Sequence, residues 1–175
     1  LYASRLVPSE RPDLAVLACT ALGLPLRVAG DGPALANLRR IAGPTVSFLG
    51  RVSDDEMARE MAEAKALIFP GEEDFGITPV ESQAAGTPVI AYGVGGALET
   101  VADPDGDDFG AASGLFFQSP TIESLAGALR RFEEKAHLFR PSVAVQNAQR
   151  FAAPRFTREM KAFIEYTLER HRDDG

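Results

Sequence analysis

Two carboxylates, Glu73 and Glu81, stand eight residues apart around Gly76 and are the best candidates for chemistry in this sequence. The apolar run 66–69 predicts a strand and the periodicity of 77–85 predicts a helix, so Glu73 falls in a loop and Glu81 on a helix. An ionised carboxylate only accepts hydrogen bonds, which suits the paired hydroxyl groups of a sugar or a ribose. A solvated acidic loop and a surface helix residue explain the same spacing equally well.

The start of this helix predicts a site for anionic oxygens. Proline is tolerated only in the first turn of a helix, so Pro79 places the start near Ile77. The main-chain N–H groups of Gly76, Ile77 and Thr78 then point free at the positive end of the helix dipole. Phosphate or hydroxyl oxygens are the ligands that we expect there.

Short apolar segments alternate with amphipathic ones along the whole chain. The expected strands are residues 1–4, 24–29, 45–49, 66–69, 88–91 and 114–117. Nearly continuous apolar composition is typical of parallel strands that are covered on both faces. The alternation predicts an α/β fold: a doubly wound, Rossmann-like, parallel six-stranded sheet with helices on both faces, in one domain over residues 1–175.

Ligands of doubly wound sheets bind beyond the carboxyl ends of the strands. The glycine-rich turns fall at these ends: Gly30-Asp31-Gly32, Gly50, Gly71, Gly76 and residues 93–96. The turn at Gly30 and Gly32 lets the main chain approach a ligand closely. It lacks the third glycine of the dinucleotide fingerprint, and a tight turn without a ligand explains it about as well.

Helical spacing fills the intervals between the strands. Apolar stripes are formed by Leu14, Leu17, Ala18, Ala21 and Leu22, by Leu125, Ala128, Leu129 and Phe132, and by Met160, Phe163, Ile164, Thr167 and Leu168. The last of these stripes lies on a helix expected over 157–170, after a segment at 143–151. Ser53 and Glu56 predict a capping box. Pro33 and Pro120 are expected to open the helices that follow them.

Composition excludes several classes of function. The formal net charge of −7 argues against a general nucleic-acid-binding face. The single cysteine, Cys19, allows no internal disulfide and no cysteine zinc site, fits a reducing cytoplasm, and is expected to pack in the core. We find neither an apolar run of membrane-spanning length nor a signal-peptide pattern. Residues 1–5 have the character of the end of a buried strand, so we expect that the sequence begins inside a fold.

Motifs over almost the whole chain resemble the retaining glycosyltransferases of the GT-B fold, family 4 (group 1), and within them the C-terminal, donor-binding domain. The matching pieces, in the family's order, are Ser4-Arg5-Leu6-Val7-Pro8, Gly30-Asp31-Gly32-Pro33, Val46-Ser47-Phe48-Leu49-Gly50-Arg51-Val52, Glu73-Asp74-Phe75-Gly76 with Pro79-Val80-Glu81, Ala85-Gly86-Thr87-Pro88-Val89-Ile90-Ala91 and Gly95-Gly96-Ala97-Leu98-Glu99-Thr100-Val101. Residues 68–76 look most like the mannosyltransferase branch that builds bacterial surface polysaccharides.

This resemblance implies that a nucleotide-diphosphate sugar, with GDP-mannose favoured and a UDP-sugar next, donates its sugar with retained configuration to a glycan or lipid-linked acceptor. The catalytic residues implied are Arg5, which would pair with the diphosphate and stabilise the leaving group, and Glu73, which would bind hydroxyls of the donor sugar. Glu81 would bind the ribose. The other implied donor-binding residues are Gly30, Gly32, Gly50, Arg51, Val52, Phe75, Gly76, Ile77 and Thr78. Neither a metal nor another cofactor is expected.

Two departures from the family pattern matter. The family normally has a lysine five residues after Arg5 that grips the diphosphate, whereas this chain has Glu10. A carboxylate facing the phosphates would repel them, so Glu10 must turn away or donor affinity is low, and Arg11 is the candidate to replace the lysine. The family's N-terminal acceptor domain is also missing. The last helix is expected to pack back toward it, and any contact with the inner membrane face would come through it, so the isolated domain should bind donor without turnover.

Other interpretations remain open on the sequence. A sugar-nucleotide 2-epimerase shares the architecture, and Glu10 favours a non-catalytic nucleotide-sugar-binding module. A pyridoxal-phosphate phosphorylase has little support, because no lysine lies beside a glycine turn. The acidic segment 103–108 resembles a calcium loop, but its glycine is early and Gly114 replaces the bidentate glutamate, so a solvated loop is the better interpretation. His137 and His171 are expected on the surface, and Ser82 lacks a nucleophile elbow.

Overall fold

The computed structural model describes residues 1–104 and 106–173, and within them six strands fall where the apolar runs predict them. They are β1 (Tyr2–Ala3), β2 (Leu26–Ala29), β3 (Val46–Gly50), β4 (Leu67–Phe69), β5 (Val89–Tyr92) and β6 (Gly114–Phe117). All of the paired strands run parallel, as their continuous apolar composition predicts. The predicted α/β class is confirmed.

The strands divide into two three-stranded sheets, with the orders β1-β2-β3 and β4-β5-β6, instead of a single six-stranded ladder. The two sheets meet where the main chain of Leu1 lies beside β4. The Leu1 nitrogen donates to the Ala66 carbonyl (2.9 Å), and the Leu1 carbonyl accepts from the Ile68 N–H (2.8 Å). These two bonds are the pattern by which one residue bridges a parallel neighbour. The order across the junction is therefore β3-β2-β1-β4-β5-β6, and it reverses direction between β1 and β4.

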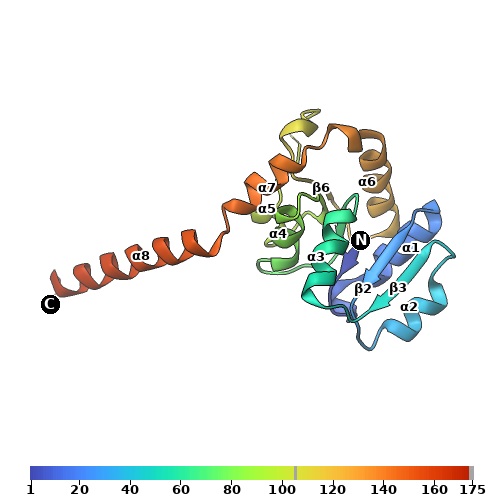
Figure 1. Ribbon diagram of the computed structural model, residues 1–175, viewed down its shortest axis with the longest axis horizontal. Coiled ribbons are helices and arrows are strands. Elements are labelled where there is room, and N and C mark those ends of the chain that lie inside the picture. Colours follow the sequence, from blue (N-terminus) through green and yellow to red (C-terminus); the bar gives the residue numbers. More distant parts are fainter. Residues whose placement is uncertain (105, 174–175) are drawn as a thin grey trace.

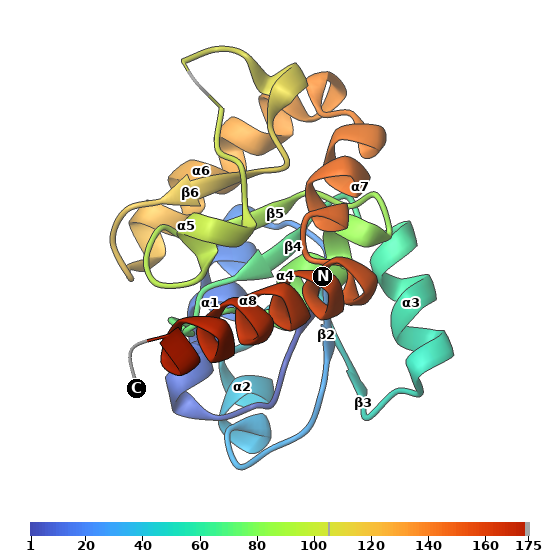
Figure 2. The same cartoon turned by 90° about the vertical axis from the view of Figure 1, so that its left-hand side faces the viewer.

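Helices cover both faces of the strands, as predicted (Figures 1 and 2). On one face, α1 (Pro12–Leu22) and α6 (Ile122–Lys135) enclose the larger apolar cluster, in which Leu14 and Leu125 are fully buried. On the other face, α3 (Asp54–Glu63) and α5 (Ala97–Thr100) contribute Met57 and Ala97 to a second cluster. The remaining helices are α2 (Leu35–Ile41), α4 (Ile77–Ala84), α7 (Pro141–Gln149) and α8 (Ala153–Asp173), with 3-10 turns at Pro8–Glu10, Phe109–Ala111 and Ala136–Leu138.

Two of the predicted helix starts are wrong. Helix α2 begins at Leu35, two residues after Pro33, because the intervening main chain is hydrogen-bonded to the turn after β1. Helix α6 begins at Ile122 because Thr121 caps it, its hydroxyl accepting from the Ser124 N–H at 3.2 Å. A threonine with an extended main chain is a favoured N-cap, and here it outweighs the preference of proline for the first turn.

Other local predictions are confirmed. The capping box at the start of α3 is present, with the Ser53 hydroxyl accepting from the Glu56 N–H and the Glu56 carboxylate accepting from the Ser53 N–H. Pro79 lies in the first turn of α4. Cys19 is buried, and burial raises the pKa of its thiol to about 11. The apolar stripe of α1 is shifted from the predicted one, since Ala21 is exposed.

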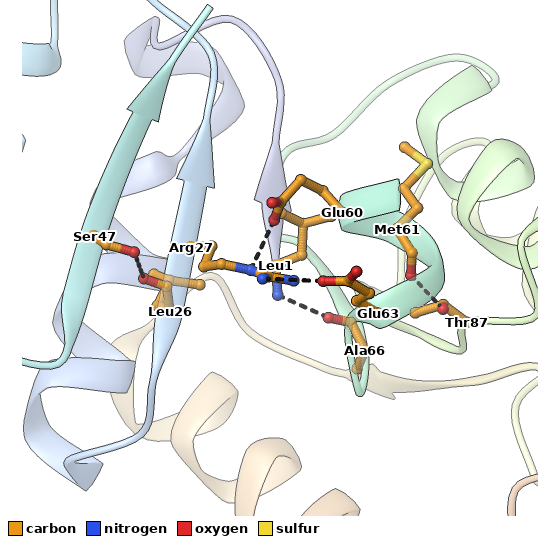
Figure 3. A network of polar contacts seen from close by, with 9 residues as sticks. All are labelled: Leu1, Leu26, Arg27, Ser47, Glu60, Met61, Glu63, Ala66 and Thr87. Carbon is orange, nitrogen blue, oxygen red and sulfur yellow. Dashed lines mark hydrogen bonds and ion pairs between the residues drawn. The ribbon is translucent and has the colours of Figure 1, made fainter. Parts of the chain in front are cut away.

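A polar network holds α3 between the two sheets (Figure 3). Arg27 on β2 lies 2.7 Å from a carboxylate oxygen of Glu60 and 3.6 Å from one of Glu63, both on α3. From the other sheet, the hydroxyl of Thr87, just before β5, donates to the Met61 carbonyl at 2.6 Å. These contacts fix α3 near the amino-terminal ends of β2 and β5.

The last helix, α8, leaves the body of the molecule (Figure 1). It spans 21 residues, more than the 157–170 that the sequence predicts. Its side chains are exposed from residue 153 to residue 168, including the large apolar ones Phe156, Met160, Phe163, Ile164 and Leu168. Within residues 1–104 and 106–173, no helix combines the length and the apolar character needed to cross a bilayer.

Candidate functional site: a cavity at the strand ends

A cavity of about 450 Å³ opens beyond the carboxyl ends of β1, β2 and β3, and we call it the strand-end cavity. Segments far apart in the sequence meet there: the residues that follow each of these strands, two methionines of α3 and two residues of α4. The lining residues are Ala3, Ser4, Arg5, Ala29, Gly30, Asp31, Gly32, Arg51, Val52, Met57, Met61, Thr78 and Glu81. The strand order reverses beside this cavity, which is where doubly wound sheets bind their ligands.

A second, more open hollow of about 560 Å³ adjoins the first, and we call it the loop hollow. Its lining consists of the loop residues Glu72, Glu73, Asp74, Phe75 and Gly76 and the first helical residues Ile77 and Thr78. Because Thr78 lines both spaces, they meet at the start of α4. Arg5 and Glu81 thus share the strand-end cavity, and Glu73 lies in the neighbouring hollow.

Most of the predicted binding residues gather around these two spaces. Those in the strand-end cavity are Arg5, Gly30, Gly32, Arg51, Val52, Thr78 and Glu81. Those in the loop hollow are Glu73, Phe75, Gly76, Ile77 and again Thr78. Two predicted residues, Arg11 and Gly50, line neither space.

Arg11 is engaged elsewhere. Its guanidinium donates two hydrogen bonds of 3.1 Å to the carboxylate of Asp13, and this pairing raises the pKa of Arg11. Its main chain is left-handed (φ 50°) at the junction into α1. The structure therefore gives no geometric support to Arg11 as the replacement for a phosphate-binding lysine.

Gly50 acts through its main chain. Its carbonyl accepts a 2.8 Å hydrogen bond from the Gly30 N–H, so the turn after β3 is fixed to the turn after β2. Its φ of 71° lies in the left-handed region that favours glycine. Gly50 shapes the wall of the strand-end cavity without lining it.

The glycines after β2 are required by packing. A Cβ atom on Gly30 would lie 2.0 Å from the Ser4 carbonyl oxygen, and one on Gly32 would lie 2.5 Å from that of Leu6. The turn after β2 thus packs directly on the turn that carries Arg5. Close main-chain packing explains both glycines with or without a ligand.

The start of α4 faces the junction of the two spaces. Gly76 is its N-cap, with a φ of 79°, and no side chain caps the helix. The N–H groups of its first turn are therefore left for solvent or a ligand, next to the positive end of the helix dipole. Ile77, with 64% of its side chain exposed, cannot be explained by core packing.

A glycine pair supports the loop hollow from behind. The Gly96 N–H donates to the Glu73 carbonyl at 2.8 Å. A Cβ atom on Gly95 would lie 2.6 Å from that same oxygen, and one on Gly96 would lie 2.4 Å from the Phe75 Cα. The sequence marks this pair as part of a strand-end turn and of a family motif, and neither signal indicates that the pair packs against the loop 73–75.

Comparison with known proteins decides the family. The model of the family "Glycosyl transferases group 1" matches residues 1–150. The chain belongs to the group 1 glycosyltransferases.

Curated relatives and solved structures agree with this placement. A D-inositol 3-phosphate glycosyltransferase of Nocardioides sp. is 40% identical over 93 residues, 53% of this chain and 19% of that protein. A GDP-mannose-dependent alpha-(1-6)-phosphatidylinositol monomannoside mannosyltransferase of Mycobacterium tuberculosis is 37% identical over 116 residues, 56% of this chain and 30% of the relative. The fold is similar to that of HepE from Anabaena, solved in complex with UDP-glucose, with a TM-score of 0.73, 23% identity and coverage of 96% of this chain and 47% of HepE. The chain therefore spans less than a third of these curated relatives.

Glu10 stands where the resemblance implies a lysine. The main chain of this residue is held by the Tyr2 hydroxyl, which donates to the Glu10 carbonyl at 3.3 Å. A Cβ atom on Gly71 would lie 3.0 Å from a Glu10 carboxylate oxygen, so the carboxyl group reaches the loop after β4. Burial and the neighbouring Glu10 carboxyl raise the pKa of Glu73.

Other candidate residues have structural roles or lie apart from the site. Ser82 is buried and its hydroxyl donates to the Thr87 carbonyl at 3.2 Å. In the acidic segment 103–108, Asp103 accepts from the Phe116 N–H at 2.8 Å, and Asp105 lies outside the described residues. Over the described part of the chain, no group of three or more His, Cys, Asp or Glu side chains could hold a metal ion.

Proposed function

We propose that this chain binds the donor substrate, a nucleotide-diphosphate sugar, in a retaining glycosyltransferase. In this proposal the base and the ribose occupy the strand-end cavity, with Glu81 accepting from the ribose hydroxyls. The sugar occupies the loop hollow, with Glu73 accepting from its hydroxyls. The diphosphate lies between them, on Arg5 and on the N–H groups of Phe75, Gly76, Ile77 and Thr78.

The observation that carries the proposal is the single junction at Thr78. A ligand with an aromatic base at one end, a polyol at the other and two phosphates in the middle needs two adjoining spaces with donors at their meeting point. Thr78 lines both spaces, and the uncapped start of α4 faces their junction. Helix starts are suited to phosphate because their N–H groups and their dipole act together.

Charge supports the same arrangement. The chain has a net charge of −7, so an anionic ligand requires local cations. Two arginines, Arg5 and Arg51, line the strand-end cavity. In the proposed reaction, Arg5 stabilises the negative charge that grows on the diphosphate as the bond to the sugar breaks. The acceptor hydroxyl attacks from the side of the leaving group, so the sugar keeps its anomeric configuration.

We propose GDP-mannose as the preferred donor and a UDP-sugar as the next choice. The Mycobacterium tuberculosis relative is described as GDP-mannose-dependent, whereas HepE was solved with UDP-glucose. The acceptor is proposed to be a glycan or a lipid-linked sugar in surface polysaccharide synthesis. It would be bound by an N-terminal domain in cis, with α8 packing back toward that domain. The buried single cysteine fits a cytoplasmic protein.

Ligand-induced stabilisation tests the donor-binding function. Melting of the 175-residue chain is followed with GDP-mannose, GDP, UDP-glucose, UDP and ADP. A ligand at a hundred times its Kd adds about 2.7 kcal/mol, or a rise in Tm of about 5–10 °C for a chain of this length. We expect GDP-mannose to give the largest rise. If none of the five ligands moves the melting curve at millimolar concentration, the proposal is wrong.

A second candidate function, nucleotide-sugar binding without transfer, is favoured by Glu10. A carboxylate in place of the lysine that grips the diphosphate weakens the stabilisation of the leaving group, on which turnover depends more than binding does. Release of nucleoside diphosphate from GDP-mannose by a protein that carries the proposed N-terminal domain, with glycan extracts as acceptors, separates the two functions. Donor binding without any release would favour the binding module.

A further inference from the structure

Phe75 lies in the loop between β4 and α4, and its ring has one aromatic partner from the far end of the chain. Phe75 as a whole residue is 42% exposed. The ring of Phe151 meets it edge-on, with the centroids 5.5 Å apart and an angle of 73° between the ring planes. Edge-to-face pairs at this separation are attractive beyond the area that they bury. Phe151 thus contacts Phe75, which lines the loop hollow, without lining the hollow itself.

Phe151 is itself held in place at the end of α7. Its N–H donates to the Ala148 carbonyl at 3.0 Å. The guanidinium of Arg150 lies 5.2 Å from the centroid of the Phe151 ring, and the same group donates to the Asn147 side-chain carbonyl at 2.8 Å. A cation over the face of a ring adds to the restraint. The ring is therefore linked through the Arg150 guanidinium to Asn147.

Asn147 connects α7 to α4 through buried hydrogen bonds. Its amide donates to the Gln83 side-chain carbonyl at 2.6 Å and to the Thr100 carbonyl at 2.8 Å. The Gln83 amide donates in turn to the carbonyls of Pro79 (3.0 Å) and Thr100 (2.8 Å). Gln83 is fully buried and Asn147 nearly so, and buried polar networks whose members are satisfied are rigid.

These contacts close a circuit around the loop. From Phe75 the chain continues through Gly76 into α4, then by side chains from Gln83 to Asn147, and through Phe151 back to Phe75. We propose that Phe151 is a positioning residue for donor binding, which acts through Phe75 to hold the N–H groups of the loop in place. This proposal rests on the proposed function, because it assigns to Phe151 an effect on the sugar diphosphate.

The two adjoining spaces make the proposal specific. Phe75 lines the loop hollow and not the strand-end cavity, where the base and ribose are proposed to bind. Loss of the Phe151 ring should therefore weaken the hold on the sugar diphosphate and leave the hold on the nucleoside unchanged. A residue that only stabilises the fold would change both affinities together or neither.

Calorimetric titration measures this difference. The ligands are the nucleotide sugar that the wild-type chain binds best, GDP-mannose or UDP-glucose, and the matching nucleoside, guanosine or uridine, which carries no phosphate. Phe151→Leu removes the ring, and Phe151→Tyr keeps it. We expect Phe151→Leu to lower the affinity for the nucleotide sugar about threefold to tenfold. We expect the same variant to leave the affinity for the nucleoside unchanged, and Phe151→Tyr to match the wild type for both ligands.

A double-mutant cycle with Phe75→Leu tests whether the effect passes through that ring. We expect the double variant to lose no more affinity than the larger single loss, since both substitutions remove one contact. Equal losses for both ligands, unchanged affinities, or additive losses in the cycle would each overturn the positioning role. Should Phe151→Leu fail to melt cooperatively, Phe75→Leu gives the same comparison from the loop side. A wild-type chain that binds neither ligand overturns the proposed function and the positioning role with it.

Discussion

The carboxyl group of Glu10 lies beside that of Glu73, and this proximity together with burial raises the pKa of Glu73. Two acidic groups therefore stand where the group 1 pattern pairs an acidic residue with a lysine. In the proposed donor site the pair places negative charge where the resemblance implies a cation, and the effect of this charge can be measured.

Replacement of Glu10 by lysine should strengthen diphosphate binding. A charge-assisted hydrogen bond contributes about 1.5–3 kcal/mol, so we expect the affinity for GDP or UDP to rise about tenfold or more. Glu10→Gln removes the repulsion without adding a donor cation and should give a smaller rise. Calorimetric Kd values for the three proteins check the order. A Glu10→Lys chain that binds no better than Glu10→Gln would show that position 10 is out of reach of the phosphates.

The same pair predicts a pH dependence of stability. A carboxyl whose pKa is raised in the folded state binds its proton more tightly there, so its contribution is present at low pH and is lost as pH rises through the raised pKa. At pH 7 we expect the Tm of Glu10→Gln to lie about 1–3 °C above that of the wild type. At pH 4 we expect the two Tm values to be equal. Melting curves from pH 4 to 8 measure the gap. A gap that is constant across this range would contradict a Glu73 pKa that is raised by the Glu10 carboxyl.

Arg5 and Arg11 form a matched pair of arginines in one loop. Arg5 lines the strand-end cavity, whereas Arg11 is paired with Asp13. We expect Arg5→Ala to weaken nucleoside diphosphate binding about tenfold or more, because a charged partner is lost. Arg11→Ala should leave it unchanged. The reverse order of the two Kd values would make Arg11 the phosphate-binding residue.

Gly96→Ala tests the support of the loop. A Cβ atom there would lie 2.4 Å from the Phe75 Cα, so the loop must shift away. We expect nucleotide-sugar affinity to fall about tenfold, because a shift of about 1 Å in the loop would misplace the N–H groups that are proposed to bind the ligand. Gly127→Ala on α6 is the control, because a Cβ atom there meets nothing within 4 Å and alanine favours a helix. Its affinity should stay at the wild-type value.

The exposed stripe of α8 predicts self-association of the 175-residue chain. Phe156, Phe163 and Leu168 are each more than half exposed on one helix. Apolar surface of this kind associates in water. We expect sedimentation velocity to show an association that grows with concentration and that Phe163→Glu reduces. A wild-type chain that stays monomeric at every concentration would contradict this expectation.

Local sequence patterns predict most of the strands, turns and helix starts that surround the candidate site. The apolar runs located the strands, and their carboxyl ends located the turns of Gly30 and Gly50. Pro79 located the start of α4, since proline has one tolerated region in a helix. Each of these signals is contained within a few neighbouring residues, where the physical rule acts directly.

Long-range geometry could not be predicted in the same way. The sequence does not say that Phe151 returns to Phe75, because only the packing of α7 on α4 brings them together. It left two directions open for Glu10 and did not show that Asp13 would take the Arg11 guanidinium. The sequence also predicts one sheet, whereas the structure has two. They are joined through the main chain of Leu1, and a single bridging residue leaves no pattern in the sequence.

Helix α8 is long and extends away from the body of the molecule (Figure 1), so a small rotation at its start moves its far end by several ångströms. Its 21 residues extend about 30 Å at the usual helical rise, and the residue two places before its start is Phe151. A rotation of about 10° at that base displaces the far end by about 5 Å. Small movements of the Phe151 ring against Phe75 therefore correspond to larger movements at the far end of α8. A partner bound at that end could in turn shift the loop that is proposed to bind the sugar.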